Sequence, residues 1–479
     1  MWGESKTLSL EIVYTDWPMK PIQAAQIPKP DYPVRIIQFG TGNFLRGFVD
    51  WMVQLMNEQL DYQTSVHIIQ SHGKQIPSSF VEQQYNYHVL IRGIAQGIQV
   101  DEVKLVTCIQ GISNPHIDHR SFLDLAHLPE LQIIVSNTTE AGIKFQNGDG
   151  SPTSPSQFFP GNLTALLHER FSHFDGDRAK GVFVLPCELI ANNGDILKAC
   201  VLDYAKEWRL SPEFEKWVDE AVHFCNTLVD RIVPGFPKEA VHDGLLQFED
   251  KLMVMAEPYH FWAVSCKKSL NSVFPAAAAG LEFLEVDDLE PYRNRKVRIL
   301  NGAHTAMVPY AYLKGFRTVR AVIEDNTLGE WVSALLAEEV VPGLDNQDAI
   351  QFAEAVLDRF RNPFIQHELA SIALNCISKF RVRVLPSILS YHSLNGEWPE
   401  RLTEAFAALL RFYKGSWKGE ILPIQDEPEL TAIFVDAWSM PTLEKTVSTL
   451  LQSEALWHMD LSVYKDLQEK IICALKSWE

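Results

Sequence analysis

Short apolar runs rich in β-branched residues alternate with longer stretches of helical periodicity over the first part of the chain. The runs that predict buried strands are 34–39, 66–70, 131–136, 181–186 and 281–286. Helical spacing of apolar positions lies between the later runs, at 163–173 and 195–208. Strands that alternate with helices form parallel sheets covered on both faces, so this part predicts an α/β domain.

The pattern of apolar positions changes after Asp288, where short apolar runs become rare and long amphipathic stretches follow. These stretches are 329–341, 348–360, 402–413 and 440–456. They predict a mostly α-helical second domain. We therefore expect a first domain over 1–288 and a second over 289–479. Five prolines within 1–33 predict an N-terminal arm that packs over the first domain without a long helix.

Size and charge narrow the classes of function. A chain of 479 residues exceeds the length over which one hydrophobic core keeps growing, which agrees with two domains. The formal net charge of -19 and the lack of a basic stripe disfavour a nucleic-acid partner. An anionic small molecule would need a locally positive pocket within this negative field. Lys or Arg is therefore expected at the site.

The seven cysteines are scattered and never spaced as CxxC. This predicts neither a disulfide framework nor a thiolate zinc site, but reduced and mostly buried thiols. The N-terminal residues lack the pattern of a secretory signal, and no apolar run approaches the roughly 20 residues that span a bilayer. We expect a cytoplasmic protein that does not bind membranes, as a monomer or a small homo-oligomer.

A glycine turn follows the first predicted strand. Gly40-Thr41-Gly42 separates the run 34–39 from a helical pattern over 44–53. Strand, glycine turn and helix in this order allow the backbone to approach a pyrophosphate, and predict a Rossmann-like dinucleotide-binding domain. Leu45 stands where the full fingerprint has its third glycine, so a purely structural turn is the alternative.

The end of the second predicted strand bears on the choice of cofactor. It reads Gln70-Ser71-His72-Gly73-Lys74 and lacks the carboxylate that would bind the adenosine ribose of NAD. Lys74 could contact the 2′-phosphate of NADP, although a solvated loop lysine is the alternative. The sequence pattern alone leaves the two cofactors open.

Three polar residues of special interest lie in a largely apolar helical stretch at the start of the second domain: Lys296, Asn301 and His304. A buried polar stripe costs free energy unless it has a function. Reduction of a ketone builds an alkoxide, which needs a proton donor and hydrogen-bond donors. Lysine can serve as the acid and base, and asparagine can donate a hydrogen bond to the developing oxyanion. Histidine can bind a hydroxyl group of the substrate or orient the lysine.

This stretch allows two other interpretations. The first is a capped helix with a satisfied core histidine. The second is a metal-dependent alcohol dehydrogenase, but His304 has no His, Cys or Asp partner spaced as a ligand set, so no metal is expected.

Four motifs together resemble the long-chain polyol dehydrogenase family, which includes mannitol 2-dehydrogenase and fructuronate reductase. They are Lys296-x4-Asn301-x2-His304, Gly40-x-Gly42-x-Phe44-x-Arg46, Leu228-Val-Asp230-Arg231-Ile-Val-Pro234 and Arg359-Phe-x-Asn362-Pro363. The resemblance covers nearly the whole chain. Segments 36–46, 136–143, 186–190 and 299–305 are most similar to the family members that reduce D-tagaturonate to D-altronate in hexuronate breakdown.

The resemblance implies a zinc-independent, NADH-dependent enzyme in which Lys296 is the acid and base, with Asn301 and His304 at the substrate. It also places Asp230 and Lys379 at the substrate, although Asp230 could instead form a structural ion pair with Arg231. The residues expected near the cofactor are Gly40, Gly42, Asn43, Phe44, Arg46, Gln70, Asn137, Thr138 and Glu140, the last three because they follow a central strand at its carboxyl end.

Two departures from the mannitol-type members concern substrate contacts. Leu189 stands where those members have a second oxyanion asparagine, and Ser371 where they have an arginine. Asn192, Asn193 or Arg381 could compensate. A related specificity, for fructuronate or a neutral ketose, and a dinucleotide-binding sensor without turnover are the alternative functions.

Overall fold

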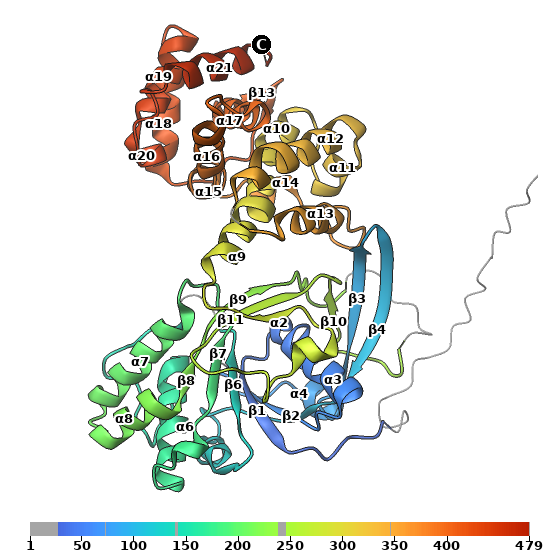
Figure 1. Ribbon diagram of the computed structural model, residues 1–479, viewed down its shortest axis with the longest axis vertical. Coiled ribbons are helices and arrows are strands. Elements are labelled where there is room, and N and C mark those ends of the chain that lie inside the picture. Colours follow the sequence, from blue (N-terminus) through green and yellow to red (C-terminus); the bar gives the residue numbers. More distant parts are fainter. Residues whose placement is uncertain (1–26, 72, 139–141, 238–245, 345, 479) are drawn as a thin grey trace, which may run out of the picture.

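The computed structural model describes residues 27–71, 73–138, 142–237, 246–344 and 346–478. A sheet-based part and a helical part are stacked along the longest axis, with the helical part uppermost in Figure 1. Two predictions fall outside the described residues: the cofactor contact of Glu140 and most of the N-terminal arm.

A six-stranded parallel sheet forms the centre of the first part. Its spatial order is β5 (Ile109–Ser113), β2 (Ser65–Ile69), β1 (Val34–Phe39), β6 (Ile133–Ser136), β7 (Phe183–Pro186) and β8 (His223–Phe224). Numbered along the chain within this sheet, the order is 3-2-1-4-5-6, that of the doubly wound dinucleotide-binding fold. The predicted Rossmann-like α/β domain is confirmed.

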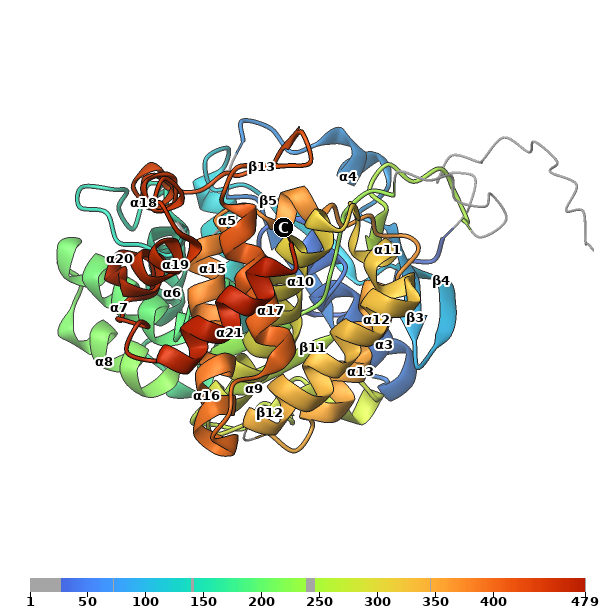
Figure 2. The same cartoon turned by 90° about the horizontal axis from the view of Figure 1, so that it is seen from above.

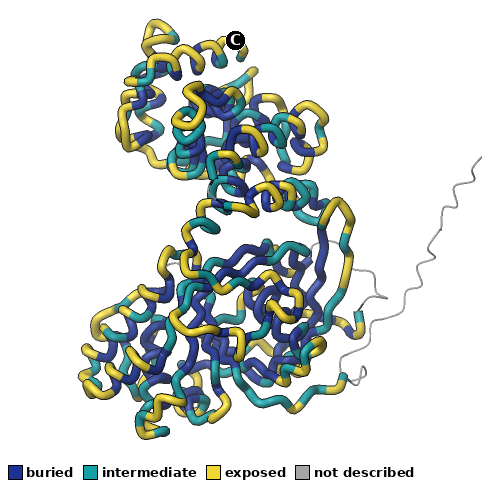
Figure 3. The backbone as a smooth tube through the Cα atoms, viewed as in Figure 1, coloured by how far each residue is buried: buried dark blue, intermediate teal, exposed yellow. Residues whose placement is uncertain are grey.

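Buried residues alternate along the central strands between the two faces of this sheet. Ile36 and Val135 face a core built with α3 (Val49–Leu60), whereas Ile37 and Ile134 face the opposite core. The second core includes α5 (His119–Asp124), α6 (Phe159–His173), α7 (Asn193–Glu207) and α8 (Pro212–Ala221). Figure 3 shows these strands as the most buried part of the domain. Two-sided burial explains their nearly continuous apolar runs.

The helix after the glycine turn is broken. Instead of one helix over 44–53, the structure has α2 (Asn43–Arg46) and then α3 from Val49. A Cβ on Gly47 would lie 3.0 Å from the Val233 side chain, and the Gly47 carbonyl accepts a hydrogen bond of 2.8 Å from Arg231 Nη1. Close packing and this external donor end the first helical turn.

Further strands extend the first part beyond the main sheet. The hairpin of β3 (Tyr87–Ala95) and β4 (Ile98–Val106) pairs with β10 (Val254–Ala256), and a second small sheet holds β9 (Asn226–Asp230), β11 (Phe261–Ser265) and β12 (Phe283–Glu285). The predicted strand 281–286 therefore belongs to a small sheet. Gly97 N, at the tip of the hairpin, donates to Asp358 Oδ2 of the helical part at 2.9 Å.

Cys225 and Cys266 form a disulfide, so the prediction of free thiols is wrong for this pair. Antiparallel β9 and β11 pair Asn226 with Ser265, which places the next residues, Cys225 and Cys266, opposite each other with a Cα–Cα distance of 4.6 Å. The other five cysteines are free, and four of them are buried as expected.

The second part is helical, as predicted. It begins with α9 (Glu290–Arg295), η6 (Lys296–Asn301), α10 (Gly302–Leu313), α11 (Val319–Glu324), α12 (Asn326–Ala334), η7 (Leu335–Val340), α13 (Ala349–Phe360) and α14 (Leu369–Ile372). It continues with α15 (Cys376–Arg383), α16 (Leu385–Asn395), α17 (Glu400–Phe412), α18 (Pro428–Trp438), α19 (Leu443–Gln452), α20 (Glu454–Trp457) and α21 (Lys465–Lys476). From above, α10 lies centrally, packed against α15 and α17 (Figure 2).

Within the described residues, no helix is both long and apolar enough to cross a membrane.

Candidate active site

The helix that carries Lys296, Asn301 and His304 changes its winding between them. Residues Lys296–Asn301 form a π-helix, and α10 continues from Gly302. Hydrogen bonds in a π-helix span five residues, so Lys296 and Asn301 lie one above the other on one face. Regular α-helical spacing would separate them by about 140°. The local winding thus aligns two of the three predicted catalytic side chains.

Lys296 reaches from the helical part to the first part of the chain. Its Nζ donates a hydrogen bond of 2.9 Å to Val229 O on β9 and lies 3.5 Å from Asp230 Oδ1. The side chain keeps 19% of its surface exposed. The ammonium group is therefore held in one place while remaining accessible to a small molecule.

A buried charge cluster supports Lys296. Arg359 on α13 donates to both carboxylate oxygens of Asp230, at 3.1 and 3.0 Å, and also contacts Glu257 Oε1 at 2.8 Å. Burial acts to raise the pKa of Asp230, but the charges of Arg359 and Lys296 outweigh it and lower that pKa. Burial raises the pKa of Glu257 despite Arg359. Asp230 thus presents a carboxylate beside Lys296.

Arg231 does not pair with Asp230, so that alternative is wrong. Its guanidinium donates to Glu257 O at 2.9 Å and to Gly47 O, and it stacks 4.0 Å from the ring centre of Trp51. The Asp230 contact to substrate stays a prediction, because both of its oxygens already accept hydrogen bonds from Arg359.

His304 presents an unpartnered nitrogen. Its Nε2 is buried and makes no hydrogen bond to any described residue. The ring packs 4.3 Å from Phe360 and 5.8 Å from His367, centre to centre. Burial, followed by the positive charges around it, lowers the pKa of His304 well below its usual value. A neutral imidazole with a free nitrogen is suited to bind a hydroxyl group.

Gly40 and Gly42 have different surroundings. Gly40 has φ +128°, and a Cβ there would lie 3.0 Å from Asn137 O. At Gly42, no heavy atom of a described residue other than its chain neighbours lies within 4 Å of the position that a Cβ would take. The turn is thus packed on its inner side and open on its outer side. Since β1 and β6 flank the point where strand order reverses, these residues fit a dinucleotide pyrophosphate.

Arg46 braces the glycine turn from inside. Its Nε donates to Thr41 O at 3.2 Å and its Nη2 to Asn43 Oδ1 at 2.7 Å, and the side chain is buried. Phe44 packs on Phe48 with ring centres 5.0 Å apart. The structure therefore brings Asn43, Phe44 and Arg46 to the turn, and their contacts to a cofactor stay predictions.

Glu188 joins the loops that follow β6 and β7, a role that the sequence did not reveal. Its carboxylate accepts hydrogen bonds from Ser136 Oγ at 3.0 Å, Thr138 N at 2.9 Å and Thr138 Oγ1 at 3.0 Å. Asn137 is fixed beside them by a bond of 2.8 Å from its Nδ2 to Cys187 O. Burial raises the pKa of Glu188. Hydrogen bonds therefore fix Ser136, Asn137 and Thr138, the described residues of the segment predicted to face the nicotinamide.

Two further predicted site residues, Gln70 and Lys379, are each fixed by a hydrogen bond to a backbone carbonyl. Gln70 is buried after β2, and its Nε2 donates to Gln75 O at 3.3 Å. Lys379 on α15 donates to Ile372 O at 3.1 Å. These hydrogen bonds fix both side chains but do not test their roles, so their ligand contacts also stay predictions.

The groups expected to replace the missing asparagine and arginine are mostly occupied elsewhere. The Asn193 amide bonds Pro186 O at 2.9 Å and Thr227 N at 2.9 Å, and Arg381 Nη1 bonds Leu456 O at 3.2 Å. Leu189 is 65% exposed, and Ser371 is exposed as well. Asn193 and Arg381 are therefore engaged by other protein groups, whereas compensation by Asn192 stays a prediction.

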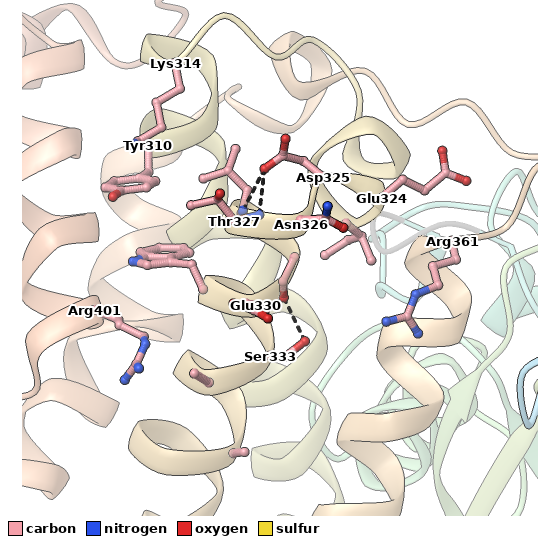
Figure 4. Close-up of a pocket in the computed structure, with 16 residues that line it drawn as sticks. Tyr310, Lys314, Glu324, Asp325, Asn326, Thr327, Glu330, Ser333, Arg361 and Arg401 are labelled. Atoms are coloured by element: carbon pink, nitrogen blue, oxygen red, sulfur yellow. Dashed lines mark hydrogen bonds between the residues drawn. The ribbon is translucent and has the colours of Figure 1, made fainter.

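Two hollows lie apart from Lys296. One of about 820 Å³ is lined by residues of α10, α11 and α12, among them Tyr310, Lys314 and Asp325 (Figure 4). The other, of about 1060 Å³, lies between the β3–β4 hairpin, β11 and α13, and Arg359 of the charge cluster is among its described lining residues. Among the described residues, no three His, Cys, Asp or Glu side chains are grouped to hold a metal ion.

Comparisons with known proteins match both parts of the chain. Residues 34–274 match the model of the mannitol dehydrogenase Rossmann domain, and residues 288–479 that of the mannitol dehydrogenase C-terminal domain. Altronate oxidoreductase of Escherichia coli O7:K1 (strain IAI39 / ExPEC) is 41% identical over 463 residues, covering 95% of this chain and 96% of that protein. Altronate oxidoreductase of Bacillus subtilis (strain 168) is 40% identical, covering 92% of each chain.

Solved structures share the fold at lower identity. The crystal structure of D-sorbitol dehydrogenase in substrate-free form superposes with a TM-score of 0.78 at 21% identity, over 96% of this chain and 97% of that one. Pseudomonas fluorescens mannitol 2-dehydrogenase, in a ternary complex with NAD and D-mannitol, gives a TM-score of 0.63 at 22% identity, over 93% and 92% of the two chains.

Proposed function

The chain belongs to the mannitol dehydrogenase family of NAD-dependent oxidoreductases, and we propose that it interconverts D-tagaturonate and D-altronate with NADH as the reductant. The observation that carries the reaction type is the position of Lys296, held at Val229 O and beside the Asp230 carboxylate. The relatives named altronate oxidoreductase support the choice of substrate.

In the direction of reduction, Lys296 gives a proton from Nζ to the ketone oxygen as the carbinol forms. Its hydrogen bond to Val229 O orients the ammonium group, and Asp230 stabilises its charge before the transfer. In the oxidation direction the neutral amine takes the hydroxyl proton. NADH, when bound at the glycine turn, supplies the hydride.

Asn301 and His304 position the reacting group. Asn301 lies on the same face as Lys296, and its amide can donate to the oxygen on which negative charge develops. His304 Nε2 has no partner among the described residues and is available to a hydroxyl of the sugar chain. Together they restrict the ketone to the orientation in which Lys296 can reach its oxygen.

We further propose that residues 1–288 bind the dinucleotide and that 289–479 supply the acid, base and substrate contacts. Gly40, Gly42 and Asn137 would lie nearest the pyrophosphate and nicotinamide, with no metal ion involved in the reaction. The protein would act in the cytoplasm as a monomer or small homo-oligomer, without nucleic-acid or membrane partners.

The direct test is a spectrophotometric assay of NADH oxidation with D-tagaturonate, D-fructuronate and a neutral ketose. We expect the highest kcat/KM with D-tagaturonate, and no oxidation of NADH with that substrate would refute the proposal. Lys296→Met should lower kcat by about 100-fold to 10,000-fold while NADH still binds. Lys314→Met, at the exposed end of α10, is the matched control and should keep full activity.

A further inference from the structure

Two cations on α15 face the catalytic helix without an acidic partner. Lys379 and Arg383 are four residues apart and therefore lie on one side of the helix. Within the described part of the chain, the side chain of Arg383 makes one long hydrogen bond, of 3.5 Å from Nη1 to Thr305 Oγ1, and that of Lys379 bonds only the carbonyl of Ile372. Among the described residues neither lies within 4.0 Å of a carboxylate, although the chain carries a net charge of -19.

Close backbone packing places Arg383 level with the catalytic residues. A Cβ on Gly302 would lie 3.1 Å from Arg383 O, so the glycine lets the end of α15 approach the start of α10. The guanidinium then reaches Thr305, the neighbour of His304. Arg383 and Lys379 are both among the positive charges that lower the pKa of His304, after its burial, His367 and Arg359.

The other cations of the site are already neutralised. Arg359 lies between Asp230 and Glu257, and Lys296 is beside Asp230. The carboxylate of Asp426 is engaged elsewhere: its Oδ2 accepts hydrogen bonds from Tyr413 OH at 2.6 Å and from Ile377 N at 3.0 Å. Its negative charge acts to raise the pKa of Lys379, but the two side chains form no ion pair. Uncompensated positive charge is therefore concentrated on the α15 side of His304.

We propose that Arg383 binds the carboxylate of the sugar acid, with Lys379 beside it, and that this contact selects hexuronates over neutral ketoses. The inference rests on the proposed function of the same site. A guanidinium can donate two parallel hydrogen bonds to a carboxylate, a geometry that a neutral hydroxymethyl group cannot use. In a ketohexuronate the carboxylate lies at the end of the carbon chain remote from the ketone. It can therefore meet α15 while the ketone meets Lys296.

The test compares D-tagaturonate with D-tagatose, which has a primary alcohol in place of the carboxylate. Arg383→Met should lower kcat/KM for the acid by about 100-fold, mainly through KM, and leave the value for the neutral ketose within about threefold. Arg383→Lys should recover part of the loss. Arg381→Met, on the same helix but bonded to Leu456 O, is the control and should keep the wild-type preference.

Equal losses on acid and ketose, or the same change in Arg381→Met, would overturn the assignment of Arg383. Calorimetric titration of D-altronate into the enzyme with NAD separates this result from failure of the proposed function. If the wild-type protein binds altronate but does not oxidise it, and Arg383→Met binds it about 100-fold more weakly, the reaction fails while the carboxylate site stands. If Arg383→Met binds altronate as tightly as the wild type, or the wild type does not bind it, the carboxylate site is refuted.

Discussion

Replacement of Arg359 by methionine tests whether the buried charge cluster holds the two parts of the chain together. Arg359 bridges Asp230 and Glu257, and the exposed fraction of its side chain is 1%. Methionine keeps the apolar volume but leaves two buried carboxylates near each other, with Lys296 as the remaining cation beside Asp230. Removing one partner of a buried ion pair costs about 3–5 kcal/mol of the free energy of unfolding.

The loss should depend on pH in a defined direction. Without the guanidinium, the pKa values of both carboxyl groups rise above those in the unfolded chain. Carboxyl groups with raised pKa values stabilise the folded state only while they are protonated, and that contribution disappears as the pH rises through the folded-state pKa. The free energy of unfolding that Arg359→Met loses relative to the wild type should therefore be larger at about pH 8 than at about pH 5.

Urea unfolding followed by tryptophan fluorescence measures this free energy. The control is Arg361→Met; this arginine side chain is 41% exposed and forms an ion pair with Asp358 at 3.4 Å. It should cost no more than about 0.5 kcal/mol. Arg359→Lys, which keeps a charge but loses the planar fork, should fall between the two. Equal losses in Arg359→Met and Arg361→Met, or a deficit that does not change with pH, would refute the reasoning.

Substitutions at three further positions test the first domain. Gly40→Ala, at φ +128° and 3.0 Å from Asn137 O, should weaken NADH binding at least about tenfold in a fluorescence titration. Burial raises the pKa of Asp50 to about 7, so ionisation of this group lowers the free energy of unfolding as the pH rises from about 5 to about 7. In Asp50→Asn this decrease, measured by urea unfolding at both pH values, should be smaller by about 2–3 kcal/mol. Glu188→Ala should raise KM for NADH several-fold, whereas Glu188→Gln, which can still accept a hydrogen bond from Thr138, should change it little; equal effects would contradict the role of these bonds.

The sequence predicted the elements whose burial is local and periodic. The strands 34–39 and 131–136 are apolar on both faces, so they stand out as continuous runs, and the glycine turn follows directly on the first of them. The polar trio Lys296, Asn301 and His304 was recognisable because the residues that flank it are largely apolar. These features need no knowledge of distant parts of the chain.

The features that sequence patterns do not predict depend on long-range contacts. The π-helical winding at Lys296 depends on backbone hydrogen bonds that composition does not specify. The disulfide of Cys225 and Cys266 depends on the register of β9 against β11, and the break at Gly47 on a donor from Arg231. The Arg359 motif is visible in the sequence, but its carboxylate partners lie 102 and 129 residues away along the chain.

The contact between Lys296 and Val229 O has a consequence for recombination between relatives. The proton donor belongs to the helical part, but the carbonyl that orients it and the carboxylate beside it belong to β9, while Arg359 of α13 completes the set. A chimera that exchanges whole domains at the linker before α9 separates these partners. Such a chimera takes β9 from one parent and α13 from the other. It should retain activity only if the strand and the helix meet with the same spacing in both parents, so β9 and α13 must remain compatible with each other.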